Sequence, residues 1–98
     1  MTTADAITGD ARLAILTELA RISDGRSNEV VLGRVLDAHG YRRSAAWLRT
    51  QLRALAEVDA IRIEELGDVM IAGIRADGRA HVERRIVIEG VARPADRD

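Results

Sequence analysis

Apolar side chains recur at intervals of three and four residues in three successive stretches of this chain, residues 10–22, 28–39 and 44–57. In a helix this spacing brings the apolar side chains to one face, so each stretch is predicted to be an amphipathic helix. Each stretch also begins near side chains that can cap a helix, namely Thr8 or Asp10, Ser27 or Asn28, and Ser44. Gly25 and Gly40 stand in the loops that end the first two helices.

A looser alternation of apolar and polar residues follows in residues 61–74, around Gly67-Asp68. Gly-Asp suits a two-residue turn between paired strands, so this stretch is predicted to be a β-hairpin. Residues 76–84 are predicted to form a short fourth helix, weakened by Gly78, and the apolar residues 86–91 to lie extended against the body. This order of elements is that of a winged helix-turn-helix, an α+β fold whose third helix commonly enters a DNA groove.

The length of the chain, 98 residues, suits one domain with a single modest core. We expect residues 1–9 to be a flexible N-terminus, residues 10–90 to form the winged-helix domain, and residues 91–98 to be a loosely ordered tail. The first residues lack the basic start and apolar stretch of a signal peptide, and no apolar run approaches the length of a membrane span. We therefore expect a cytoplasmic protein without a membrane partner.

The residue types present limit the chemistry. The absence of cysteine excludes disulfides and thiolate metal sites, and the absence of lysine excludes the phosphate-binding loop that depends on one. His39 and His81 are the only histidines, and they lie on different predicted elements. We therefore expect no catalytic activity, no metal site and no cofactor.

The third predicted helix carries the candidate binding residues, because its apolar stripe turns the opposite face outward. The stripe consists of Ala45, Leu48, Leu52 and Leu55. On the second predicted helix, the residues expected to face the core are Val31, Leu32, Val35 and Leu36. Arginines beside an outward face can contact phosphates, and Arg49 or Arg53 could reach a base edge. The predicted DNA-binding residues are Arg42, Arg43, Ala46, Arg49, Thr50 and Arg53.

The distribution of charge complicates this hypothesis. The formal net charge is −1, whereas contacts to phosphates usually require a basic excess. Residues 42–53 carry four arginines and no acid, but residues 57–68 carry five acids and one arginine. The predicted hairpin would therefore repel phosphates, so it either stays clear of DNA or binds protein. Alternatively, the arginines form a solvated helix face and pair with acids such as Glu57 or Asp59.

Five segments together resemble a known family. They are Arg12-Leu-Ala-Ile-Leu, the leucine-rich third helix, Ile63-Glu-Glu-Leu-Gly-Asp-Val, Asp77-Gly-Arg-Ala and Gly90-Val-Ala-Arg-Pro. In this order they resemble a family of small proteins found in Mu-like phages and prophages, over about residues 10–94. The resemblance implies a winged-helix fold, a phage or prophage origin and no established catalytic activity, and it supplies no functional residues.

Two functions follow from these observations. The first is a phage-type winged-helix protein that binds double-stranded DNA as a homodimer and regulates transcription or handles phage DNA. Its dimer interface is predicted to use Leu13, Leu16, Ile86 and Ile88. The alternative is a winged helix used as a protein–protein interaction module in phage assembly or host takeover, with a phage or host protein as partner.

Overall fold

The computed structural model describes residues 3–95, with side chains from Asp5 onward. Within this part the chain is α+β, with four helices and one antiparallel sheet. The elements are α1 (Thr3–Arg21), β1 (Arg26–Asn28), α2 (Glu29–Ala38), α3 (Ala45–Glu57), β2 (Ile61–Leu66), β3 (Val69–Ile74) and α4 (Ala76–Val82). This order is compatible with the predicted winged helix-turn-helix. None of the four helices is long and apolar enough to cross a membrane.

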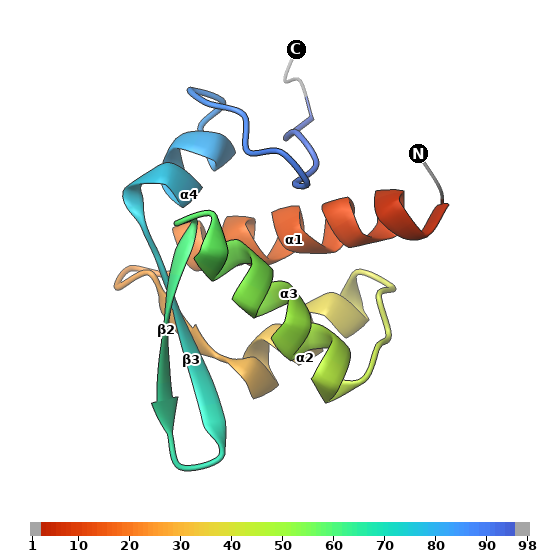
Figure 1. Ribbon diagram of the computed structural model, residues 1–98, viewed down its shortest axis with the longest axis vertical. Helices are drawn as coiled ribbons and strands as arrows, with labels where there is room; N and C mark the ends of the chain where they lie inside the picture. Colours follow the sequence, from red (N-terminus) through yellow and green to blue (C-terminus); the bar gives the residue numbers. More distant parts are fainter. Residues whose placement is uncertain (1–2, 96–98) are drawn as a thin grey trace.

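The β2–β3 hairpin projects from one side of the helices, whereas α4 and the C-terminal segment lie at the other end, above α1 (Figure 1). The hairpin pairs Leu66 with Val69 across Gly67, which takes the left-handed conformation (φ 60°) that a two-residue turn requires. A third strand, β1, pairs with β3 on its other side, so the strand order is β1-β3-β2. Sequence analysis missed β1, because three residues are too few to display an alternating pattern.

Local signals in the sequence place α2 and α3 correctly. The Asn28 side chain accepts a hydrogen bond from the Val31 backbone N–H (2.9 Å), and Ser44 Oγ accepts one from that of Trp47 (3.1 Å). Each side chain satisfies one of the free N–H groups at the start of its helix. Gly40 follows α2 with φ 87°, a conformation that glycine adopts without steric cost. The predicted caps and the left-handed glycine are therefore confirmed.

The first helix begins earlier than predicted. It starts at Thr3, so Thr8 and Asp10 lie inside it and cap nothing, and residues 3–9 are helical instead of flexible. The C-terminal segment packs beside these turns, since the Ala92 backbone N–H donates to the Gly9 carbonyl oxygen (3.1 Å). The two residues are far apart in the chain, and helical spacing alone gives no sign of this contact.

The core lies between α1, α2, α3 and the inner face of the sheet. Its fully buried large side chains are Ile15, Leu16, Leu19, Leu32, Leu52, Leu55 and Ile61. Two residues predicted to face this core, Val31 and Ala45, are exposed. Both belong to the first turn of their helix, on a side that stays open to solvent, so this part of the prediction is wrong.

A buried histidine connects α4 to the C-terminal segment. His81 Nε2 lies 2.8 Å from the Ala92 carbonyl oxygen, and its Nδ1 lies 3.0 Å from the Ile88 backbone nitrogen. The neutral ring donates from Nε2 and accepts at Nδ1, so both nitrogens are satisfied. Val91 is also buried. The start of the predicted loose tail is therefore fastened to the body, while residues 96–98 lie outside the described part of the chain.

Candidate nucleic-acid interface

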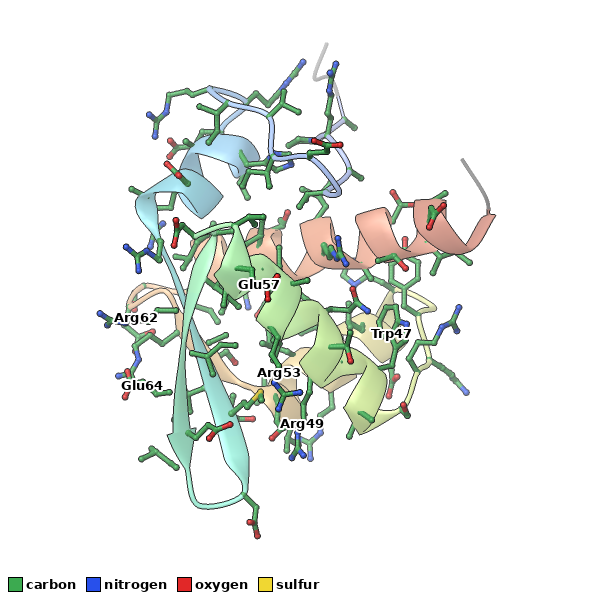
Figure 2. All side chains as sticks on the ribbon, in the orientation of Figure 1. Trp47, Arg49, Arg53, Glu57, Arg62 and Glu64 are labelled. Atoms are coloured by element: carbon green, nitrogen blue, oxygen red, sulfur yellow. The ribbon has the colours of Figure 1, made fainter. Side chains whose placement is uncertain are left out.

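The outward face of α3 consists of the residues that helical spacing predicts. Ala46, Thr50, Arg53 and Glu57 are all exposed on this helix. Figure 2 shows Arg53 and Glu57 on the side of α3 that faces away from α1. Within residues 3–95 no side chain forms an ion pair or hydrogen bond with Arg53. Its guanidinium is therefore available to a ligand.

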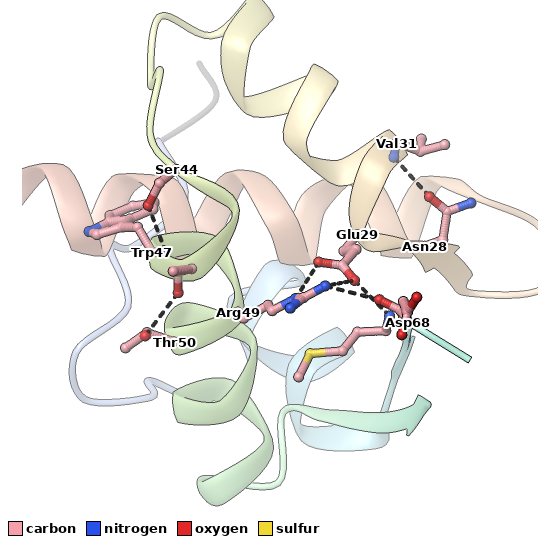
Figure 3. Close-up of polar contacts among 10 residues, drawn as sticks. Asn28, Glu29, Val31, Ser44, Trp47, Arg49, Thr50 and Asp68 are labelled. Carbon is pink, nitrogen blue, oxygen red and sulfur yellow. Dashed lines mark hydrogen bonds and ion pairs between the residues drawn. The ribbon is translucent and has the colours of Figure 1, made fainter. Parts of the chain in front are cut away.

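Arg49, one turn before Arg53, has a different environment. Its Nε donates to Glu29 Oε2 (2.7 Å) and its Nη2 to Glu29 Oε1 (2.9 Å), a bidentate ion pair between α3 and α2 (Figure 3). Nη2 also lies 2.9 Å from the Asp68 carbonyl oxygen in the hairpin turn. These three bonds hold Nε and Nη2 of Arg49 within the protein, while its side chain stays 39% exposed, so DNA contact by Arg49 remains a prediction.

Glu29 is the buried centre of this junction, with 6 % of its side chain exposed. Besides the two bonds from Arg49, its Oε1 accepts a hydrogen bond from the Met70 backbone N–H (2.9 Å) near the start of β3, next to the hairpin turn. The hydrogen bond from Arg49 lowers the pKa of the Glu29 carboxyl below its usual value, against the opposing effect of burial. A single ionised carboxylate thus joins α2, α3 and the hairpin.

Sequence analysis assigned Glu29 only a favourable place in the first turn of α2 and did not find this role. Arg49 and Met70 lie 20 and 41 residues further along the chain, so no local spacing indicates either contact. A possible signal is position, since Glu29 precedes Leu32 and Leu36 by one and two turns on their buried face. An acid on a buried face needs a cationic partner.

The remaining predicted residues lie around the start of α3. Arg42 and Arg43 are exposed, and Arg43 Nη1 donates to the Arg42 carbonyl oxygen (2.9 Å) while its guanidinium carbon lies 5.7 Å from the centre of the Trp47 ring. Thr50 Oγ1 donates to the Ala46 carbonyl oxygen (3.1 Å), a bond within the helix that leaves its lone pairs open to a donor.

Sequence analysis missed a further arginine at this site. Arg34 on α2 is exposed and lies with Arg43 along one hollow of about 230 Å³ between α2 and α3, which Tyr41 and Trp47 also line. Within the described part of the chain no acid pairs with Arg34. Cations from α2 and from the link that precedes α3 therefore border the N-terminal end of α3.

The acids of the hairpin are partly neutralised. Glu64 pairs with Arg26 of β1 (3.0 Å), and Asp68 and Glu65 lie close enough to Arg49 to raise the pKa of its guanidinium, after the larger effect of Glu29. The ion pair on α3 is therefore made with Glu29, and neither Glu57 nor Asp59 takes part.

The described residues hold no group of three histidine or acidic side chains that could bind a metal ion.

The predicted dimer interface does not form one surface. Leu16 is completely buried and Ile88 is 8 % exposed, so both already belong to the core of a single chain. Leu13 packs partly against the same core, and Ile86 is 40 % exposed. The prediction is wrong for Leu16 and Ile88, because the spacing of apolar residues does not distinguish a buried face from one that meets a second copy.

Comparison with known proteins indicates the family to which this chain is related. No family model matches the chain, and neither does a solved structure. The "uncharacterized protein gp26" of Escherichia phage Mu is 33% identical over 93 residues, which cover 95% of this chain and 96% of that protein. The predicted resemblance to a Mu-like phage family is thereby confirmed: this chain belongs to the family of phage Mu gp26.

Proposed function

We propose that this protein is a winged-helix protein that binds double-stranded DNA through the outward face of α3, and that it regulates transcription or handles DNA for the phage. The observation that carries the proposal is the contrast on α3 itself. Arg49 donates three hydrogen bonds within the protein, whereas Arg53, one turn later and exposed, forms no ion pair or hydrogen bond with the described side chains.

The order of elements supports this assignment. Helices α2 and α3 are joined by a short link, and the β2–β3 hairpin follows α3 directly, as the wing does in a winged helix (Figure 1). Ala46 and Thr50 make the outward face of α3 narrow enough to approach base edges, and Arg53 supplies the donors that pair with guanine.

The charges at the start of α3 supply the contacts to phosphates. Arg34, Arg42 and Arg43 are exposed there, and Arg53 extends the group along the helix. A protein that neutralises three or four phosphates loses DNA affinity with a slope of about −3 in log K against log salt. Because the hairpin turn exposes Asp68, the wing stays away from the phosphates and α3 makes most of the contacts.

The test is fluorescence anisotropy of labelled duplex DNA, titrated with the protein at low and near-physiological salt. We expect binding that weakens steeply with salt, and a loss of about tenfold or more for Arg53→Ala and for Arg42→Ala at low salt. Arg85→Ala is the matched control, because Arg85 is also exposed but lies beyond α4, away from α3. Equal losses in all three variants would mean that net charge, and not α3, determines binding.

A second candidate function is a protein–protein interaction module, favoured by the acidic hairpin and the net charge of −1. Under this function the partner is a phage or host protein, and its complex depends less steeply on salt than a DNA complex does. Absence of DNA binding at both salt concentrations would favour this module. We propose no catalytic role under either function.

A further inference from the structure

Strand β2 is an edge of the sheet. The order β1-β3-β2 gives β2 one neighbour, and no other described segment pairs with its second edge. Five of its six residues are at least partly exposed, and Leu66 is 60 % exposed. An edge of this kind presents backbone N–H and C=O groups that a further strand can pair with.

The hairpin fixes which backbone groups point to the open edge. A two-residue turn makes Leu66 and Val69 a hydrogen-bonded pair, and such pairs recur at every second residue of an antiparallel ladder. The Arg75 backbone N–H donates to the Ala60 carbonyl oxygen (2.9 Å), which continues the same alternation at the other end of β2. The backbone groups of Ile61, Ile63 and Glu65 therefore point away from β3, toward the open edge.

We propose that β2 pairs antiparallel with β2 of a second copy of this chain. The two-fold axis of this dimer passes between the two Ile63 residues. In this register the Ile63 residues of the two copies form a hydrogen-bonded pair. Arg62 of each copy then faces Glu64 of the other in a non-hydrogen-bonded pair, where side chains approach most closely. The two sheets join into one, with both α3 helices on the same side of it.

The charges of β2 favour this register over the registers whose axis lies at Arg62 or at Glu64. An axis shifted to Arg62 would place the two Arg62 side chains opposite each other, and an axis at Glu64 would do the same for two carboxylates. Like charges directly opposite destabilise a strand pair, whereas opposite charges stabilise it. The sequence Arg62-Ile63-Glu64 is thus complementary to itself in one antiparallel register.

The side chains concerned are in position to make these contacts. Arg62 and Glu64 extend from the hairpin on the side away from the helices (Figure 2). Arg62 has no ion pair or hydrogen bond within residues 3–95. Glu64 uses Oε1 to accept from Arg26 (3.0 Å), which leaves Oε2 for Arg62 of the second copy. Because these contacts rest on β2 alone, the inference does not depend on the proposed DNA binding.

The test is sedimentation equilibrium of the full chain without DNA, over a wide range of concentrations at low salt. We expect a monomer–dimer equilibrium for the wild type. Arg62→Glu and Glu64→Arg each place like charges opposite each other, so each raises the dimer Kd by about tenfold or more. The double variant Arg62→Glu/Glu64→Arg restores opposite charges and should dimerise like the wild type.

A mixture of the two single variants gives the sharpest result. In the mixed dimer, one copy carries carboxylates at both positions 62 and 64 and the other carries guanidinium groups at both, so both cross-strand pairs join opposite charges. A heterodimer should therefore form although neither variant forms a homodimer readily. Glu83→Arg and Arg85→Glu are matched controls, since each reverses one charge of an exposed ion pair (2.7 Å) outside β2, and they should leave the dimer Kd unchanged. Circular dichroism of each variant checks that it folds.

Three results would overturn the inference: a wild-type chain that stays monomeric at every concentration, single variants that dimerise as well as the wild type, and a mixture that forms no heterodimer. The first leaves the exposed edge unpaired in solution. The second and third assign the dimer to another surface or another register. None of these results bears on whether α3 binds DNA.

Discussion

Two arginines on neighbouring turns of α3 serve different purposes. Arg49 meets the buried carboxylate of Glu29 and the Asp68 carbonyl oxygen, and so joins three elements. Arg53 is exposed and forms no ion pair or hydrogen bond with the described side chains. The two arginines are one helical turn apart. Their difference teaches that a partner on another element, and not helical position alone, decides whether an arginine serves structure or binding.

The contacts of Arg49 also bear on how the exposed face of α3 is presented. Because Arg49 bonds to the turn of the hairpin and Glu29 bonds to the Met70 N–H, the direction in which the hairpin leaves α3 is fixed by one polar junction. A bidentate arginine–carboxylate pair has a defined geometry, unlike an apolar contact, which permits sliding. The junction therefore sets the angle between α3, the proposed DNA-binding helix, and the hairpin.

The largest effect that would test this comparison is the loss of Glu29. Glu29→Ala leaves the guanidinium of Arg49 without its carboxylate partner and the Met70 N–H without its acceptor. Breaking a buried pair costs about 3–5 kcal/mol, but Arg49 is partly exposed and can regain water, so we expect a loss of about 2–3 kcal/mol in the free energy of unfolding. Urea unfolding followed by circular dichroism measures it.

Glu83→Ala is the control for this substitution, since it removes a carboxylate from an exposed ion pair with Arg85, outside β2. Exposed pairs contribute about 0–1 kcal/mol, so Glu83→Ala should change the free energy of unfolding far less than Glu29→Ala does. Equal losses in the two variants would mean that the junction at Glu29 has no special structural role.

A change of pH should have a smaller effect on the free energy of unfolding. Hydrogen bonding to Arg49 lowers the pKa of Glu29 in the folded chain, below the unfolded value of about 4.3. Below that value the unfolded chain takes up a proton more readily than the folded one. The contribution of Glu29 is therefore fully present above the unfolded pKa and is lost as the pH falls through the folded one.

The variant Glu29→Gln isolates this contribution, because glutamine cannot ionise but keeps an oxygen for the Met70 N–H. The difference in free energy of unfolding between wild type and Glu29→Gln should be largest near pH 7 and should shrink as the pH falls below the unfolded value. Urea titrations at a series of pH values from neutral to acid measure it. A difference that stays constant with pH would contradict the assignment of the lowered pKa to Glu29.

The sequence predicts the parts of this molecule that short-range rules determine. The bounds of α2 and α3, the caps at Asn28 and Ser44, and the turn at Gly67 depend on neighbouring residues, and all were found. The outward face of α3 also followed from helical spacing.

What sequence analysis missed depends on contacts between distant segments. The Glu29–Arg49 pair joins two helices, the C-terminal segment bonds to α1 at Gly9, and β1 pairs with β3. Leu16 appeared suitable for a dimer because spacing shows that a face is apolar but not what covers it. In each case the deciding partner lies on an element whose position only the folded chain supplies.

The smallest effect compares the two arginines directly. Lysine keeps the charge but makes a single-point contact in place of the planar fork, so Arg49→Lys gives up the bidentate geometry with Glu29 and the bond to Asp68. We expect it to cost about 1–2 kcal/mol in the free energy of unfolding, since one or two hydrogen bonds are lost. Arg53→Lys changes an exposed side chain that no described residue pairs or hydrogen-bonds with, so its cost should stay within about 0.5 kcal/mol. Thermal or urea unfolding of the two variants side by side measures the difference. If Arg53→Lys destabilised the chain as much as Arg49→Lys, Arg53 would have a structural role too, and the distinction between the two arginines would fail.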